Sequence, residues 1–209
     1  MRVIIPLFLF LSAIPEVYTQ GTAEDTSPRK FKTPDALGRH LFQAIKTGNY
    51  KQAANASALA INSKDMKHIG QDLIKIVEQK IKAGDYENPA DGQAVIQGIR
   101  STFLNEDEIK KQFAKLKQDE KEFKKSFNQV HDMDQIQEFD WKKAKYLRTD
   151  SAQIKKDRMV PLTVGDLFIH FKSANQEFRI KLPNCANPSR LGWLTDSDPL
   201  SLEPVKITK

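Results

Sequence analysis

The stretch LFIHFKSANQEFRIKL at residues 167–182 constrains the fold more than any other part of the chain, because apolar and polar side chains alternate along most of it. Period-two alternation is typical of half-buried β-strands. We therefore predict a β-hairpin. Its apolar face consists of Leu167, Ile169, Phe171, Phe178, Ile180 and Leu182.

The register of this hairpin decides which side chains meet across the two strands. With residues 173–176 as the loop, Phe171 lies opposite Phe178, and the next apolar pair is Ile169 with Ile180. A slip of one residue would turn these side chains outward. An isolated hairpin is only marginally stable, so its apolar face needs a covering helix or sheet.

Helical patterns before the hairpin can supply that cover. A helix is predicted to begin at Thr33-Pro34-Asp35, which combines an N-cap, a first-turn proline and an early acid. It ends near Gly48, and residues 50–60 form a second, alanine-rich segment. Three longer patterns follow, which run from Ser63 to Gly84, from Val95 to Phe103 after the turn-like DYENPADG, and from Glu106 to Val130, with Ser63 and Asn105 as caps.

Strand patterns dominate the remaining residues. Besides the hairpin, we predict strands at 139–149 and at 191–195 around Trp193, whereas residues 150–161 are either a further strand or a loop. Helices followed by antiparallel strands are typical of an α+β domain. The expected fold therefore has N-terminal helices packed on one face of a C-terminal antiparallel sheet.

The N-terminus has the layout of a secretory signal peptide. Arg2 precedes an apolar run from Val3 to Ile14, and small residues near Gly21 offer a cleavage site. The run is shorter than the roughly 20 residues that span a bilayer, so we predict a secreted or periplasmic protein without a transmembrane segment. The predicted divisions are a signal peptide at 1–21, a flexible leader at 22–33, a single α+β domain at 34–196 and an irregular tail at 197–209.

The net charge of +6 is modest for a chain in which 29% of residues are charged. In the lysine-rich segment 106–127, acids and lysines stand four residues apart, which is typical of a solvated helix face. We therefore expect no nucleic acid partner. Weak binding of a polyanion stays open, since an excess of positive charge attracts such partners.

Residues that would hold a metal, a cofactor or a nucleophile form no recognisable motif. His131, Asp132 and Asp134 cluster in HDMD, but no second histidine stands at helical ligand spacing. Cys185 is the single cysteine, and we expect a buried thiol at the end of a strand. The sequence predicts no metal and no cofactor.

Two sets of residues on the predicted strands are candidates for function. Asp140, Tyr146 and His170 are the credible acid–base set, although alternation turns His170 away from the apolar face and favours a surface histidine. The aromatic candidates for ligand stacking are Trp141, Tyr146 and Trp193. Core packing is the commoner fate of such strand aromatics.

The segments TPDALGRHLFQAIKTGNY, DWKKAKYLRTD, GDLFIHFKSANQEFRIKLPNC and GWLTD together resemble the cystatin-like superfamily typified by nuclear transport factor two, and in particular small exported bacterial proteins of unassigned role. The resemblance spans most of residues 34–196. It implies a helix over a curved antiparallel sheet and a cone between them in which members bind or transform small molecules. Fold alone decides neither function.

These observations favour an exported, non-catalytic domain that binds a small apolar ligand or a protein partner. The alternatives are a small-molecule enzyme with a cone-shaped pocket, for which Asp140 and His170 would be required, and a polyanion-binding surface protein.

Overall fold

The computed structural model describes residues 31–133, 140–156, 163–173, 176–188 and 192–205. The predicted signal peptide at 1–21 and most of the leader lie outside these residues. The helices are α1 (Pro34–Lys46), α2 (Tyr50–Ala54), α3 (Ser63–Ala83), α4 (Pro89–Phe103) and α5 (Glu106–Asp132), with short 3-10 helices η1 (Ala58–Ala60) and η3 (Trp141–Lys143). The strands are β1 (Lys145–Lys156), β2 (Thr163–Ser173), β3 (Gln176–Asn187) and β4 (Ser201–Pro204).

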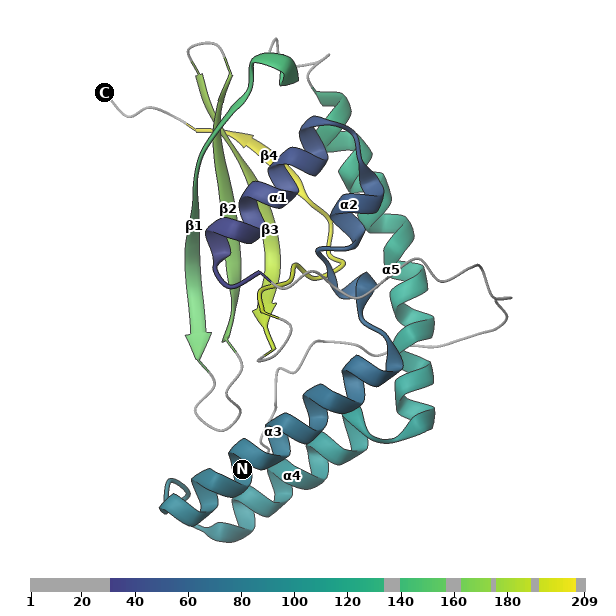
Figure 1. Cartoon of the computed structure of the whole chain (residues 1–209), viewed down its shortest axis with the longest axis vertical. Helices are drawn as coiled ribbons and strands as arrows, with labels where there is room; N and C mark the ends of the chain where they lie inside the picture. The colour runs from purple at the N-terminus through teal and green to yellow at the C-terminus, as the bar shows by residue number, and fades with distance from the viewer. Residues whose placement is uncertain (1–30, 134–139, 157–162, 174–175, 189–191, 206–209) are drawn as a thin grey trace.

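The four strands form one antiparallel sheet in the order β1-β2-β3-β4, and α1 lies across its inner face (Figure 1). Helices fill the N-terminal part of the chain and strands the C-terminal part, so the predicted α+β class is confirmed. The hairpin register is also confirmed, because Phe171 pairs with Phe178 and Ile169 with Ile180. The predicted loop is too long, since Ser173 and Gln176 still pair with each other.

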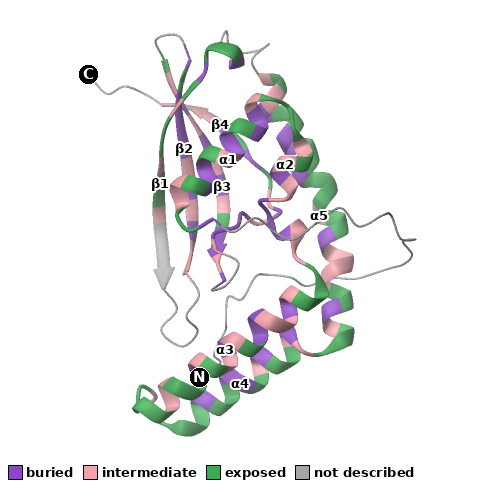
Figure 2. Cartoon of the chain, in the orientation of Figure 1, coloured by how far each residue is buried: buried purple, intermediate pink, exposed green. Residues whose placement is uncertain are grey.

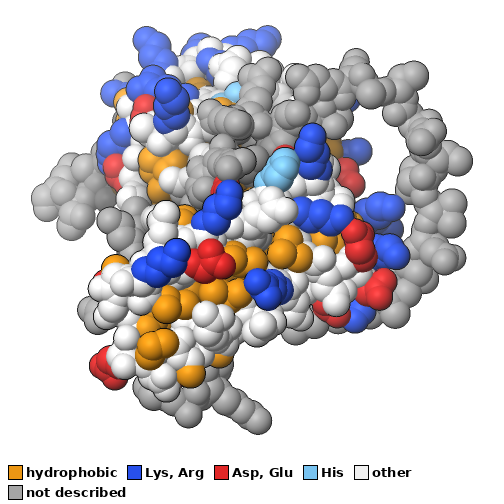
Figure 3. All heavy atoms as spheres, turned by 60° about the horizontal axis from the view of Figure 1, so that its bottom comes forward, with side chains coloured by type: hydrophobic (Ala, Val, Ile, Leu, Met, Phe, Trp, Pro, Cys, Tyr) orange, Lys and Arg blue, Asp and Glu red, His pale blue; other side chains and the backbone are white. Residues whose placement is uncertain are grey.

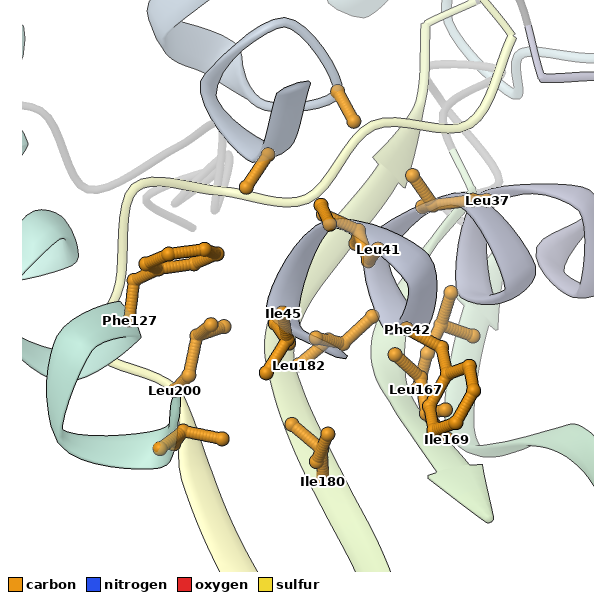
Figure 4. Packing of buried hydrophobic residues seen from close by; sticks show 14 of the residues in the cluster. Leu37, Leu41, Phe42, Ile45, Phe127, Leu167, Ile169, Ile180, Leu182 and Leu200 are labelled. Atoms are coloured by element: carbon orange, nitrogen blue, oxygen red, sulfur yellow. The ribbon is translucent and has the colours of Figure 1, made fainter. Parts of the chain in front are cut away.

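The main hydrophobic core lies between this inner face and α1 and α5. All six apolar residues of the hairpin are buried there. Figure 4 shows Leu41, Phe42 and Ile45 of α1 directed toward the strands. Phe127 of α5 and Leu200 lie together at the left of the same cluster. The α1 helix is amphipathic because its apolar residues recur every three or four positions.

Local sequence signals explain where the helices begin and end. Thr33 caps α1 by accepting a hydrogen bond from the Ala36 amide, and Asn105 caps α5, both as predicted. The predicted cap at Ser63 is wrong by one residue. Asn62 caps α3 in a reciprocal capping box with Asp65. The Asn62 side-chain oxygen accepts a hydrogen bond from the Asp65 backbone N–H, and the Asp65 carboxylate accepts one from the Asn62 backbone N–H. Gly84 ends α3 in the left-handed conformation, with φ 77°.

A second hydrophobic core holds together the lobe made by α3, α4 and the start of α5 (Figures 1 and 2). Its buried residues are Met66, Ile69, Leu73, Val77, Val95, Ile96, Ile99, Phe103 and Leu194. The segment 192–195 connects the two cores, because Leu194 belongs to the second and Trp193 to the first. The α5 helix also contacts both, through Phe113 and Phe123.

Several predicted strand and tail boundaries are wrong. Residues 141–143 form a 3-10 helix because the Asp140 side chain caps it, and β1 then runs to Lys156. Residues 192–195 make isolated bridges in place of the predicted strand around Trp193. The tail predicted to be irregular contains β4, where Leu202 opposite Ile180 extends the inner face of the sheet.

The end of the predicted flexible leader is also ordered. Phe31 is buried in the main core, and its carbonyl accepts a hydrogen bond of 2.7 Å from the Trp193 amide. A bridge between Phe31 and Gly192 brings the two chain segments together. Burial of the Phe31 ring thus holds the end of the leader in place, although its polar composition predicted a flexible segment.

Close packing of α1 on β1 depends on Gly38. A Cβ atom at this position would lie 1.9 Å from Thr149 Oγ1 and 3.0 Å from Thr149 Cβ. We therefore expect Gly38→Ala to lower the free energy of unfolding by about 1–3 kcal/mol, as overpacking does. Urea unfolding measures the loss. In a Thr149→Ala background the loss should be smaller, and an equal loss in both backgrounds would refute the contact.

Candidate interaction surface

The aromatic residues predicted to stack on a ligand pack on one another. Trp141 is buried and stacks on Phe171, with ring centroids 5.2 Å apart. Phe171 in turn stacks on Phe178 at 5.5 Å, and Phe42 of α1 contacts Phe171 at the same separation. Trp141 Nε1 donates a 2.7 Å hydrogen bond to the carbonyl of His131. The ring and the polar atom of Trp141 therefore both have partners within the protein.

Trp193 is also buried in the main core, and it lies outside the four strands. Its backbone N–H donates a hydrogen bond to the carbonyl of Phe31. The neighbouring Leu194 exchanges two backbone hydrogen bonds with Ala186. Together these contacts make Trp193 part of the seam that joins the segment 192–195 to β3. Its position favours packing over ligand stacking.

Tyr146 lies at the edge of the core and is tied to α1. Its hydroxyl donates to the Asp35 carboxylate and lies 2.7 Å from Thr149 Oγ1, and Arg39 covers its ring at 4.4 Å from the centroid. Burial, with the neighbouring Asp35, raises the pKa of Tyr146 to about 12. The hydrogen bond from Tyr146 lowers the pKa of Asp35. Tyr146 thus stays protonated and holds α1 against β1.

The three residues of the predicted acid–base set have separate partners. Asp140 caps η3, and its backbone is hydrogen-bonded to the hydroxyl of Ser173. Tyr146 faces Asp35 on the side of α1, whereas His170 lies on the outer face of the sheet. The contacts of the described residues therefore do not bring the three together around one reacting atom.

His170 is the centre of a charged cluster on the outer face. Its Nε2 lies 3.2 Å from the Asp150 carboxylate, and its Nδ1 lies 2.8 Å from Glu177. The guanidinium of Arg148 bridges the same two carboxylates, at 3.0 Å and 3.2 Å. His170 is on the outer face as predicted, but it is only 7% exposed, because charged neighbours from β1 and β3 cover it. The prediction that His170 is exposed to solvent is therefore wrong.

Opposite charges also face each other across the rest of the outer face. Arg179 on β3 pairs with Glu203 on β4 at 2.6 Å, and Lys181 pairs with Asp166 on β2 at 2.8 Å. Cross-strand pairs of this kind each stabilise a sheet by tenths of a kcal/mol up to about 1 kcal/mol. Alternation in the hairpin placed Arg179 and Lys181 on the outer face, but sequence reasoning missed their partners Glu203 and Asp166. The central outer face is a charge-compensated surface.

Neither a metal nor a reactive thiol emerges from the described part of the chain. No group of three or more His, Cys, Asp or Glu side chains in these residues is arranged to hold a metal ion. His131 Nδ1 lies 2.7 Å from the carbonyl of Ile45, and Asp134 of the HDMD motif falls outside the described residues. Cys185 is buried as expected, and burial raises the pKa of its thiol.

A stripe of hydrophobic side chains runs along the seam of α3 and α4 (Figure 3). Half-buried residues that pack on the second core include Ile61, Ile74, Ile81 and Tyr86. Lysine and acidic side chains flank the stripe in the figure. Among the described helices, none combines the length and apolar character needed to cross a bilayer.

Three carboxylates gather where the C-terminal segment crosses α5. Burial, together with the neighbouring Asp198 and Asp119, raises the pKa of Asp196 to about 6. Burial also raises the pKa of Asp119 on α5. The Ser197 amide donates a 2.7 Å hydrogen bond to Asp196, which partly offsets the cost of the buried charge.

No family model, no curated protein and no solved structure matches this chain. The resemblance to the cystatin-like superfamily therefore rests on the sequence segments quoted above.

The raised pKa of Asp196 makes stability depend on pH. Since the folded state binds this proton more tightly than the unfolded chain, the free energy of unfolding should fall as pH rises from about 4 to about 6. We expect a loss of about 2–3 kcal/mol, at 1.36 kcal/mol per pKa unit. Asp196→Asn should remove most of this loss in denaturant titrations at pH 4 to 7.

The control is Asp107→Asn, at a side chain that is 82% exposed. An Asp196→Asn profile that parallels the wild type across this range would show that the buried carboxylate does not carry the effect.

Proposed function

We propose that this chain is an exported, non-catalytic interaction domain of cystatin-like arrangement, which binds its partner through the exposed side of the sheet. The observation that carries the proposal is the filled interior. Trp141, Phe171 and Phe42 contact one another in the place where the resemblance implies a ligand-binding cone. Export is inferred from residues 1–21, whose layout is that of a signal peptide.

The separate positions of the acid–base candidates also favour binding over catalysis. A general acid–base pair has to converge within hydrogen-bond reach of one substrate. Asp140 caps a 3-10 helix, and His170 is held between Asp150 and Glu177 on the outer face. Each side chain already has a structural partner, so neither needs a catalytic role to explain its position.

The charge of α5 offers no support for the polyanion alternative at that helix. Residues 106–132 contain seven lysines and seven carboxylates, so the helix has no net charge. Its first turn holds Glu106, Asp107 and Glu108, which suit the positive end of the helix dipole. A polyanion would therefore have to bind a surface other than α5.

Uptake of apolar molecules tests whether the interior is a binding site. The wild-type protein should show its bare polypeptide mass in native mass spectrometry and no saturable binding of an apolar fluorescent dye. Trp141→Ala should create a cavity, bind the dye and lower the free energy of unfolding by about 3–5 kcal/mol.

Phe113→Leu, at a half-buried ring on the second core, is a matched control that leaves the main core intact. A small apolar molecule retained by the wild type would refute the proposal and would restore the cone as the binding site.

A further inference from the structure

Four lysines gather at one corner of the sheet, where η3 leads into β1 beside the end of β2. We call this group, together with the neighbouring Leu147, the basic corner; its lysines are Lys142, Lys143, Lys145 and Lys172. All four are exposed. The ends of β1 and β2 that carry the corner lie at the top of Figure 1, near the C-terminus of α1. Lys46 of α1 anchors the segment by donating a 2.8 Å hydrogen bond to the carbonyl of Ala144.

Among the described residues, the basic corner has fewer opposite charges at ion-pair distance than the rest of the outer face, although Glu177 lies opposite Lys172 in the β2–β3 register. Lys145 lies directly opposite Lys172 in the β1–β2 register. Like charges in such a pair destabilise a sheet. Within the described ranges, no carboxylate lies within ion-pair distance of Lys142, Lys145 or Lys172, and Lys143 has only the long 3.7 Å contact with Asp140. A partner that supplies negative charge would relieve the repulsion between Lys145 and Lys172.

Leu147 adds an apolar group to this charged corner. It is 41% exposed, and no other large hydrophobic side chain in the part of the chain that the structure describes is as exposed. A β-bulge places both Leu147 and Arg148 opposite His170, which interrupts the normal alternation of β1. The bulge thus leaves a leucine in solvent between Lys145 and Arg148.

We propose that the basic corner binds an anionic lipid surface. Lysines gain from phosphate headgroups, and an exposed leucine gains from the boundary of the acyl chains, so a lipid surface satisfies both features. A soluble polyanion would satisfy the lysines alone. Protection of the β1 edge from aggregation explains edge lysines and a bulge, but an exposed leucine works against such protection.

The proposal deepens the proposed function and rests on it, because it names the partner of the exposed side of the sheet. The two can fail separately. Loss of vesicle binding would leave the filled interior and its dye test unaffected, whereas a ligand in the interior would leave the vesicle result standing.

Vesicle co-sedimentation of the full chain tests the proposal. The vesicles are pure phosphatidylcholine or phosphatidylcholine with 30% phosphatidylglycerol, at low and high salt. Every variant carries the same N-terminus, so binding to pure phosphatidylcholine reports the contribution of the apolar run at Val3 to Ile14. The readout is the additional partitioning onto anionic vesicles, which should weaken steeply with salt.

The variant that neutralises the corner is Lys142→Gln, Lys143→Gln, Lys145→Gln and Lys172→Gln together. It should lose at least a hundredfold in anionic partitioning, since each lysine contributes about fivefold near such a surface. The matched control changes the same net charge at four exposed helical lysines, Lys64, Lys75, Lys82 and Lys121, and should lose less than tenfold. Leu147→Ser should lose about three- to tenfold without any change in charge.

Circular dichroism confirms that each variant is folded. Equal losses in the corner variant and its control would overturn the proposal, because binding would then follow net charge alone. An unchanged Leu147→Ser variant, together with lysine-dependent retention on heparin, would overturn it in favour of an acidic glycan.

Discussion

The packing of α1 on the inner face of the β2–β3 hairpin is the interaction on which the rest of the structure depends. Phe42 of α1 contacts Phe171, and Gly38 lets the helix approach Thr149 on β1. An uncovered hairpin would expose six apolar side chains and would be marginal on its own. The hydrogen bond from Tyr146 to Asp35 fixes the same helix at its first turn.

This packing also decides where a partner can bind. Aromatic rings fill the interior, so a ligand could enter it only if the core repacked. A partner that binds the outer face or the ends of the sheet requires less repacking. The centre of the outer face is occupied by mutually paired charges, with His170 held between Asp150 and Glu177. The basic corner differs, because Lys145 lies opposite Lys172 and the exposed Leu147 lies close to Lys145 in β1. In the function proposed above, the core and the binding surface would therefore be separate.

Much of the fold could be predicted because its signals are local. Alternation in residues 167–182 determined both the face and the register of the hairpin, and caps at Thr33 and Asn105 determined helix starts. The misses arose where tertiary contacts outweigh local pattern. Residues 201–204 form β4 only because β3 offers an edge, and Phe31 is ordered only because Trp193 lies beside it.

The candidate site was less predictable than the fold. Trp141 and Tyr146 were found from the sequence as aromatics near the hairpin, but their roles depend on contacts with Phe171 and Asp35. The burial of His170 could not be anticipated, since it requires Asp150 and Glu177 from two neighbouring strands. The exposure of Leu147 follows from a bulge that alternation alone does not reveal.

Native-state amide hydrogen exchange tests the central packing most directly. If α1 and the hairpin form one cooperative unit, amides at 41–45, at 167–171 and at 178–182 should all exchange with the free energy of global unfolding. Exchange of the α1 amides at an opening free energy several kcal/mol below that of the hairpin would contradict the account, because the helix would then leave the sheet without unfolding it.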